Sequence, residues 1–311
     1  MAVQHDIVHT TVYRYRDPVS FGEHRVMFRP RDSHDQRVLA TDLAVSPPSI
    51  VRMIQDPHSN SIALVQPLES TTELRIVCSF TIEHAQGAEL PPPLAQAAEY
   101  LPFAYAPQQR LDLEHYLRPH HDDPQGKLIA WTHQFLTHGA RAGTRDLLAR
   151  MNSHIGQSLI YLPRDEEGTQ SPPETLERGS GSCRDYALLM MEAIRRLGVA
   201  ARFVSGYLYD ASLDGGMAAT GAGTTHAWLQ AYLPGAGWVT YDPTNNSQGG
   251  SQLIQVGVVR DPAFAAPISG SWFGKADAYL GMTATVQVRR RVPPTPDVAP
   301  HPATVAATIG V

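Results

Sequence analysis

Cysteine is scarce in this sequence, with only Cys78 and Cys183 among 311 residues. So small a number excludes a disulfide-rich scaffold and agrees with a reducing compartment. The longest basic cluster is residues 289–291, too short for a nucleic-acid-binding surface, and the net charge is −5. No stretch approaches the roughly 18 apolar residues of a membrane span, and the start lacks the pattern of a secretory signal. We therefore expect a cytoplasmic protein with no nucleic-acid partner and no membrane association.

Common ligand motifs are missing as well. The sequence contains no phosphate-binding glycine loop and no G-x-S-x-G elbow. Histidines and aspartates crowd residues 115–123, but their spacing matches no zinc motif, and we expect a solvated loop there. The acidic run at residues 165–167 lacks the alternating ligand pattern of a calcium loop. We predict no cofactor and no metal site, and the sequence does not indicate an oligomeric state.

The composition is that of a globular protein, with 42% hydrophobic and 18% charged residues. The length suggests two domains. We predict an N-terminal antiparallel β domain over residues 1–93 and a connecting segment over residues 94–125. An α+β core is expected over residues 126–290, followed by a Pro/Ala-rich, disordered tail over residues 291–311.

The N-terminal part has the pattern of short strands. Four segments are rich in β-branched and aromatic residues or alternate in polarity: residues 8–15, 41–46, 61–65 and 73–83. We expect the first to stop at Asp17-Pro18. Cys78 lies in the last, where a buried, inert thiol is expected. Short strands at this spacing predict an antiparallel sheet or sandwich.

Helical spacing of apolar residues appears further along the chain. Residues 127–138 and 147–158 show it, and a stronger stripe follows Cys183. The stripe consists of Ala187, Met190, Met191, Ile194 and Leu197. Ser180 or Ser182 can cap the start of this helix, and Gly198 is suited to follow its end.

Cys183 is therefore expected in the first turn of a helix. The backbone amides there are unpaired and the helix dipole is positive, so a thiolate is favoured. Cysteines so placed can have pKa values lowered to roughly 3.5–7.5. Neighbouring glycines would let a substrate backbone approach closely. Taken alone, the pattern also fits a structural cysteine.

A predicted hairpin carries the second part of the signal. Residues 225–233 alternate as a strand, residues 234–237 form a turn, and residues 238–242 return as a strand ended by proline. A three-residue loop makes Asp242 the same-face diagonal neighbour of His226, and a five-residue loop places the two directly opposite. A four-residue loop would put them on opposite faces.

The sequence thus offers a polarised cysteine, a histidine and an acid. These suit a nucleophile, a general base and a carboxylate that orients the base. Asp242 would fix the imidazole tautomer, and His226 would hold the thiolate as an ion pair and protonate the leaving amine. The alternatives are a buried histidine bonded to backbone and an aspartate that only forms a turn.

Three motifs together resemble the signature blocks of the transglutaminase-like superfamily, above all its bacterial and archaeal branch. They are Gly181-Ser182-Cys183-Arg184-Asp185-Tyr186-Ala187, His226-Ala227-Trp228 and Tyr241-Asp242-Pro243-Thr244-Asn245. The N-terminal part, with His9-Thr10 and Arg29-Pro30-Arg31, looks like the β region that often precedes this core in bacteria. The resemblance covers nearly the whole chain except the tail.

The resemblance implies a papain-like α+β core and a catalytic triad of Cys183, His226 and Asp242. It also implies an oxyanion hole made by the nucleophile's N–H and an upstream side chain, for which Tyr161 is the candidate. Trp228 shares the face of His226 and is a candidate either for the wall of the substrate cleft or for packing in the core, and Ser182 is a second candidate for the cleft. Residues 211–224 are rich in glycine and alanine and are either a mobile lid or a surface insertion.

The expected reaction is acyl transfer on a peptide or protein substrate through a thioester on Cys183. The acceptor is water in a peptidase or amidase and an amine in a transglutaminase. The bacterial branch of the family favours hydrolysis. The alternative from another class is a binding module that retains the fold without catalysis. The chemistry itself needs no cofactor.

Overall fold

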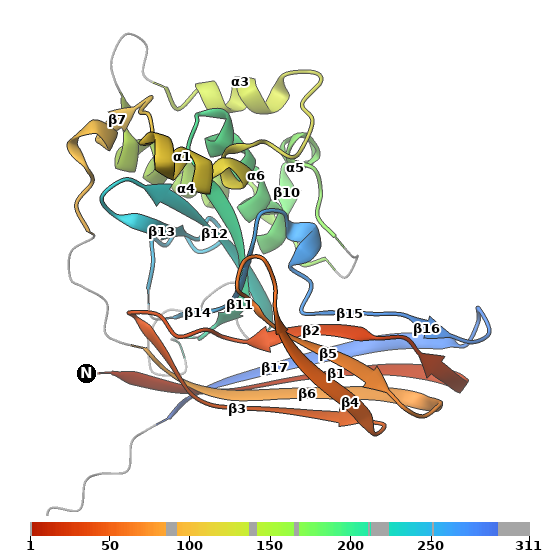
Figure 1. The fold of residues 1–311 in the computed structure, drawn as a ribbon. Helices are drawn as coiled ribbons and strands as arrows, with labels where there is room; N and C mark the ends of the chain where they lie inside the picture. Colours follow the sequence, from red (N-terminus) through yellow and green to blue (C-terminus); the bar gives the residue numbers. More distant parts are fainter. Residues whose placement is uncertain are drawn as a thin grey trace, which may run out of the picture.

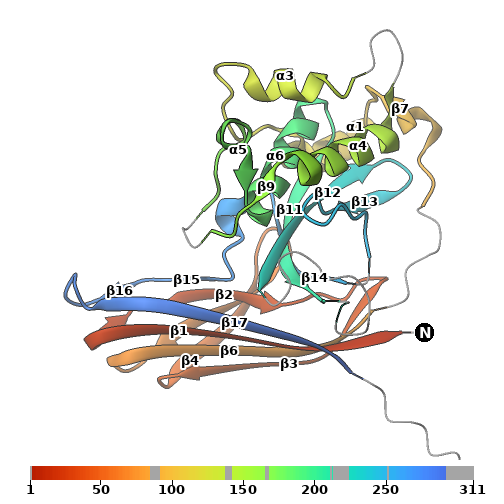
Figure 2. The same ribbon diagram turned by 180° about the vertical axis from the view of Figure 1, so that it is seen from behind.

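The computed structural model describes residues 2–84, 92–136, 142–164, 168–210, 212, 224–250 and 252–291. A β-rich part forms the lower half of the molecule in Figure 1, and a part that combines helices with a second group of strands lies above it. Figure 2 shows the same two parts from behind. The α+β class with a preceding antiparallel β region, predicted from the sequence, is confirmed.

The largest sheet of the β-rich part is antiparallel and is built on the first strand of the chain. It contains β16 (Trp272–Phe273), β1 (Val3–Phe21), β6 (Thr71–His84) and β3 (Gln36–Ser46) in that order, and β17 (Tyr279–Arg291) also pairs with β1. Alternate residues of β6, including Ile76, Cys78 and Phe80, are buried, as expected of a half-buried strand. The expectation that the first strand stops at Asp17-Pro18 is wrong, because β1 continues to Phe21. Pro18 is tolerated because the pairing of β1 with β6 is interrupted between Arg14 and Val19.

A second antiparallel sheet packs against the first. Its order is β15 (Ile268–Ser269), β2 (His24–Arg29), β5 (Ser61–Pro67) and β4 (Ser49–Gln55). Neither β2 nor β4 was predicted from the sequence. All seven residues of β4 are exposed or partly exposed, so this strand lacks the alternation in polarity from which a strand can be recognised. Side chains of both sheets form one hydrophobic cluster, which includes Ile7, Val26, Val65 and Ile76.

The end of the described chain returns to the N-terminal sheet. Residues of β17 pair with β1 from Tyr15↔Tyr279 to Gln4↔Arg291. Residues 279–290, predicted to be part of the α+β core, and Arg291, predicted to be in the tail, belong instead to a strand of the N-terminal sheet. Local alternation predicts a strand but not its partner, which here lies more than 260 residues away in the sequence. The rest of the predicted tail, residues 292–311, is outside the described residues.

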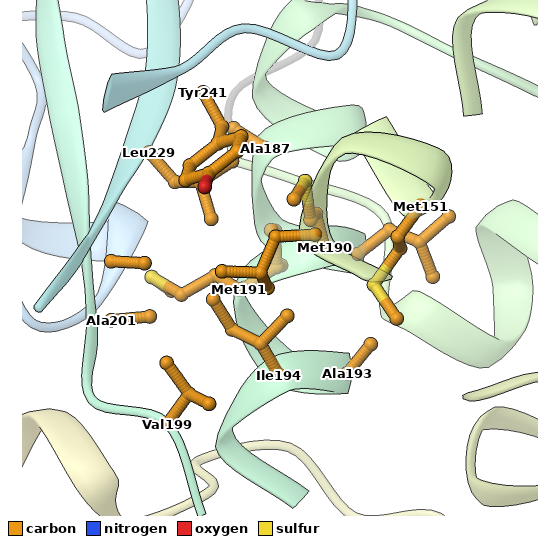
Figure 3. Packing of buried hydrophobic residues seen from close by; sticks show 14 of the residues in the cluster. Met151, Ala187, Met190, Met191, Ala193, Ile194, Val199, Ala201, Leu229 and Tyr241 are labelled. Atoms are coloured by element: carbon orange, nitrogen blue, oxygen red, sulfur yellow. The ribbon is translucent and has the colours of Figure 1, made fainter. Parts of the chain in front are cut away.

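The upper part is built around one antiparallel sheet and one buried helix. The sheet order is β13 (Gly237–Tyr241), β12 (Thr225–Leu233), β11 (Ala201–Leu208) and β14 (Leu253–Val259). Helix α6 (Cys183–Arg196) packs on β12 and also contacts α4 (Thr144–Ser158) and α5 (Pro172–Arg178). Figure 3 shows Met190, Met191 and Ile194 of α6 within the cluster that also holds Leu229 and Met151. The predicted apolar stripe is thus part of the core, but Leu188, Leu189 and Ala193, which lie off the stripe, are buried in the same cluster.

The remaining helices and short strands lie around this core. They are η1 (Gln96–Ala98), β7 (Tyr100–Leu101), α1 (Pro107–Asp112), α2 (Glu114–Leu117), α3 (Lys127–His133), β8 (Ala142–Gly143), β9 (Ile160–Tyr161), β10 (Ser180–Gly181) and η3 (Pro262–Phe264). Helix α3 ends five residues earlier than predicted, and α4 starts three residues earlier. Neither α1 nor α2 contains a buried residue, so the sequence carries no periodic signal for them.

The two parts are joined by a buried asparagine and by a shared hydrophobic cluster. Asn60 Nδ2 donates to the carbonyl of Val258 at 2.7 Å, and Val258 N–H donates to Asn60 Oδ1 at 2.9 Å. Tyr207 of β11 and Ile254 of β14 belong to the cluster of the N-terminal sheets. The sheet that carries the candidate site therefore rests directly on the N-terminal part.

Candidate active site

Cys183 is the first residue of α6, as predicted. Ser182 precedes the helix with extended backbone angles, φ −88° and ψ 176°. Upstream, β10 pairs in parallel with β9, which places Gly181 beside Tyr161. The Cys183 side chain is almost enclosed, and the residue is 8% exposed. A thiol in this position faces the unpaired amides of the first helical turn.

The hairpin formed by β12 and β13 has the three-residue loop that was one of the predicted registers. Leu233 pairs with Gly237 and Leu229 pairs with Tyr241, which leaves residues 234–236 as the loop. Extending this register makes Asp242 the same-face diagonal neighbour of His226. The contact exists, because His226 Nε2 lies 2.9 Å from Asp242 Oδ2.

Asp242 is held by a turn as well as by the histidine. Its Oδ2 accepts a second hydrogen bond from Asn245 Nδ2 at 2.9 Å, and its Oδ1 accepts one from the Thr244 N–H at 3.0 Å. Burial would raise the pKa of this carboxyl, but the His226 charge and these hydrogen bonds hold the pKa below its usual value. The two interpretations of Asp242 are therefore compatible: one oxygen forms the turn, and the other receives the imidazole.

The His226 ring lies between the carboxylate and the thiol. Because a carboxylate only accepts, Nε2 carries the proton that faces Asp242, and the buried Nδ1 has no hydrogen-bond partner among the described residues. Cys183 lies close enough that the two side chains shift each other's pKa. Burial lowers the pKa of His226, but Asp242 and the Cys183 thiolate together raise it well above its usual value.

The pKa of the Cys183 thiol is shifted in the opposite direction, downward. Burial raises the pKa of Cys183, but contact with His226, the backbone of Ala227 and the charge of Arg184 together bring the pKa below its usual value. Cysteine reactivity follows the thiolate population. The arrangement therefore favours a thiolate–imidazolium pair.

Tyr161, the candidate for the second oxyanion donor, lies beside Cys183. It is half-buried, and burial together with the neighbouring Cys183 raises the pKa of its hydroxyl. Its ring packs edge-on against Tyr186 of α6, with ring centroids 6.2 Å apart. A hydroxyl that keeps its proton next to the nucleophile is a hydrogen-bond donor.

Comparison with known protein families gives two matches. Residues 5–83 match the bacterial transglutaminase-like N-terminal region, and residues 132–243 match the transglutaminase-like superfamily. The part of the chain over residues 132–243 thus has the sequence of a transglutaminase-like core. The three residues proposed as a triad, Cys183, His226 and Asp242, all lie within the second match.

Relatives and one solved structure match this protein over most of its length. An uncharacterized protein of Mycobacterium leprae is 26% identical over 287 residues, covering 90% of this chain and 97% of that protein. An uncharacterized protein of Mycobacterium tuberculosis strain H37Rv is 28% identical over 277 residues, covering 85% and 86%. A "putative cysteine protease" from Cytophaga hutchinsonii superposes with a TM-score of 0.67 at 20% identity, covering 95% and 92% of the two chains. The last similarity shows that the two proteins share a fold.

Two candidates for the substrate cleft of this transglutaminase-like core are not open to solvent. Trp228 is 1% exposed and packs with Val204 and Val258, while its ring lies 5.9 Å from that of His226. The buried indole therefore packs beside the imidazole ring and does not line an open cleft. Ser182 is 4% exposed, and its hydroxyl donates to Asp185 Oδ2 at 2.8 Å. The predicted lid, residues 211–224, lies outside the described residues except for Ser212 and Thr224.

Several residues at the site were not singled out from the sequence. Asn245 and Thr244 hold Asp242, and the Asp-Pro-Thr-Asn order that places them is a turn signal. Asp185 was quoted within a motif but given no role. In the structure it is a buried acceptor at the start of α6.

The other polar segments of the sequence analysis have structural partners. The backbone N–H groups of His120 and His121 donate to Glu192, and Asp123 Oδ2 accepts from the Ile129 N–H at 2.9 Å. Within the described ranges, no three His, Cys, Asp or Glu side chains are grouped so as to hold a metal ion. The acidic run at residues 165–167 is outside the described residues. Among the helices that the structure describes, none is long and apolar enough to cross a membrane.

Proposed function

We propose that this protein is a cysteine-dependent hydrolase of peptide or amide bonds that works through a thioester on Cys183. The transglutaminase-like fold supports cysteine-based catalysis in general. The observation that carries the finer proposal is the buried set formed by Cys183, His226 and Asp242, in which the thiol pKa is lowered and the imidazole pKa is raised.

The reaction starts from the thiolate–imidazolium pair. The Cys183 Sγ attacks the carbonyl carbon and forms a tetrahedral oxyanion. As the intermediate collapses, the C–N bond breaks and the His226 Nδ1–H passes its proton to the leaving amine, which leaves a thioester on Cys183. Water then gives a proton to His226 and attacks the thioester, and the acid product leaves as the thiolate re-forms.

The oxyanion would be stabilised by two donors. One is the Cys183 N–H, a first-turn amide with no partner inside the helix. The other is the hydroxyl of Tyr161, whose backbone pairs with Gly181 and whose side chain contacts Cys183. Donors placed in advance at a developing charge are commonly the largest contribution to such catalysis.

Water as acceptor is preferred here, and amine transfer is the alternative with the same first half-reaction. A binding module without catalysis is the third reading, and a complete set of nucleophile, base and carboxylate speaks against it. On sequence grounds we place the activity in the cytoplasm, on a peptide or protein substrate, without nucleic acid or membrane as a partner.

The reactivity of the thiol separates an enzyme from a binding module. Alkylation of Cys183 by iodoacetamide, followed by peptide mass spectrometry, is expected to persist well below pH 8 in the wild type. It should take on an ordinary thiol profile in His226→Ala. Cys78 is an internal control, because burial raises the pKa of its thiol to about 12. An ordinary profile at wild-type Cys183 would leave the proposal without a nucleophile.

The acyl acceptor requires a separate experiment. A peptide library is incubated with the protein and the Cys183 acyl adducts are identified, with Cys183→Ala as the blank. The identified donor is then supplied in ¹⁸O-labelled water with and without a primary amine. Incorporation of ¹⁸O into the acid product supports hydrolysis, and an amide product at the expense of the acid supports the transferase.

A further inference from the structure

We infer that Asp185 is a positioning residue for the nucleophile: its carboxylate fixes the backbone that carries Cys183 and ties it to the chain that follows Tyr161. The inference rests on the proposed function of Cys183. It assigns the acidic residue of the Cys183-Arg184-Asp185 sequence a task separate from that of Asp242.

Both oxygens of Asp185 accept hydrogen bonds, and Arg164 Nη1 contacts the two of them, with Oδ2 at 3.2 Å. Oδ2 accepts hydrogen bonds from the Ser182 N–H and from the Ser182 hydroxyl, each at 2.8 Å. Oδ1 accepts from the Gln170 N–H at 2.7 Å and from Arg164 Nη1 at 3.0 Å. The side chain is wholly buried beside an Arg164 side chain that is 18% exposed. The carboxylate is therefore surrounded by donors alone.

The contacts on Oδ2 fix the position of the nucleophile. Ser182 immediately precedes Cys183 and Asp185 lies in the same helical turn, so the hydrogen bond between them encloses Cys183 in a closed ring of backbone. A capping carboxylate of this kind satisfies an otherwise unpaired amide. The Asp185 side chain packs tightly against the backbone of Gly181, since a Cβ on Gly181 would lie 2.9 Å from Asp185 Cβ.

The contacts on Oδ1 reach beyond the helix. Arg164 and Gln170 belong to the segment that follows β9, and the Leu162 N–H donates to the Gly181 carbonyl at 2.9 Å. The Asp185 side chain thus adds a second connection, beyond the pairing of β9 with β10, between the nucleophile's backbone and the segment that follows Tyr161. An ordinary helix cap would need only the Ser182 contact.

Asp185→Asn tests this assignment because it preserves size but not acceptor capacity. An amide has one oxygen and one NH₂ group, and either orientation turns a donor toward a donor. The expected result is a displaced Ser182–Cys183 backbone, a loss of contact with the His226 ring and a higher pKa for Cys183. Each unit of that rise lowers the thiolate fraction about tenfold below both pKa values.

Glu192→Gln is the matched control. Glu192 is another wholly buried carboxylate on α6, and it accepts from Arg195, Arg196 and the His120 N–H. It lies nine residues after Cys183, about 13 Å along the helix. Both variants should therefore lose stability, but only Asp185→Asn should lose reactivity of the Cys183 thiol.

The readout is the rate of Cys183 alkylation by iodoacetamide from pH 5 to pH 10, with the unfolding midpoint in urea measured on the same samples. We expect Asp185→Asn to react at least about tenfold more slowly than the wild type at pH 6 and equally fast at pH 10, where the thiol is ionised in both. Glu192→Gln should keep the wild-type profile. Ser182→Ala removes a single donor to Asp185 and should shift the pH profile of alkylation in the same direction by a smaller amount. This variant replaces Asp185→Asn in the test if Asp185→Asn does not fold.

The outcomes separate the two proposals. A low-pH reaction in the wild type that persists unchanged in Asp185→Asn and Ser182→Ala overturns the positioning role and leaves the proposed function standing. Equal losses in Asp185→Asn and Glu192→Gln also overturn it, because the effect is then one of stability. If the wild type itself has an ordinary thiol profile, the proposed function is the one that fails.

Discussion

His226 Nε2 and Asp242 Oδ2 lie 2.9 Å apart, and both side chains are completely shielded from solvent. Salt screens buried charge pairs far less than exposed ones, so this contact holds the imidazole across a wide range of conditions. It also determines which ring nitrogen is left for the thiol. The carboxylate can only accept, so Nε2 carries a proton and Nδ1 is directed to Cys183.

Asp242→Asn should therefore inactivate the protein without removing the nucleophile. The Asn NH₂ group can donate to Nε2, which moves the ring proton to Nδ1 and gives the tautomer that cannot accept from the thiol. A comparable substitution in a serine protease triad lowers kcat by about 10⁴, and we expect a loss of that order in hydrolysis of the donor peptide.

The control for this substitution is Asn245→Ala, which removes one hydrogen bond from Asp242 but leaves the carboxylate. It should lower the rate far less than Asp242→Asn. Equal losses in the two variants would mean that the turn, and not the carboxylate–imidazole contact, is what the site requires.

The part of this site that could be read from the sequence is the part encoded by local periodicity. The stripe beginning at Ala187 predicts the helix and puts Cys183 at its start. Alternation in residues 225–233 predicts a strand, and turn residues limit the register to few choices. These signals are local in the sequence, so they can be recognised without knowledge of the fold.

The remainder depends on contacts between distant segments. Asp185 receives Arg164 and Gln170 through a loop whose conformation has no periodic signal. The pairing of β17 with β1 likewise joins the two ends of the described chain. Trp228 shares a face with His226, as alternation predicts, but whether that face is open or packed depends on side chains of distant strands, such as Val204 of β11 and Val258 of β14.

Tyr161→Phe should reduce turnover while leaving the nucleophile active. The hydroxyl lies next to Cys183, and its removal deletes one donor to the oxyanion. Loss of such a donor costs about 10²–10³ in kcat. We expect this loss in the hydrolysis of the donor peptide, with KM little changed and with alkylation of Cys183 at pH 6 preserved. A variant with wild-type kcat would assign the oxyanion to other donors.

His9 should make folding stability dependent on pH. Its ring lies 2.9 Å from the Tyr207 hydroxyl, across the contact between the N-terminal sheet and β11, and burial lowers its pKa from 6.5 to about 4. The unfolded chain therefore binds the proton more readily between pH 6.5 and pH 4. The stabilisation is complete above pH 6.5 and is lost as the pH falls toward 4, by about 3 kcal/mol.

The measurement for His9 is the free energy of unfolding in urea at pH 4.5 and pH 7 for the wild type and for His9→Gln. The fall in stability between the two pH values should be smaller in the variant. Tyr207→Phe keeps His9 buried and should retain the slope. An unchanged slope in His9→Gln would place the acid sensitivity in other groups.

Gly206→Ala should damage the fold and the site together. Gly206 pairs with His226 across β11 and β12. A Cβ at this position would lie 2.1 Å from the Ile254 carbonyl oxygen and 2.8 Å from Trp228 Cη2. The backbone of β14 and the indole behind the imidazole must both move, and overpacking of this kind costs about 1–3 kcal/mol or more. The unfolding midpoint in urea should fall, and alkylation of Cys183 at pH 6 should slow because the His226 ring shifts.

Gly143→Ala is the matched control, since its Cβ would meet Asp146 Cβ at an ordinary 3.7 Å. If Gly206→Ala unfolds at the wild-type midpoint and labels at the wild-type rate, Trp228 does not hold the imidazole in place.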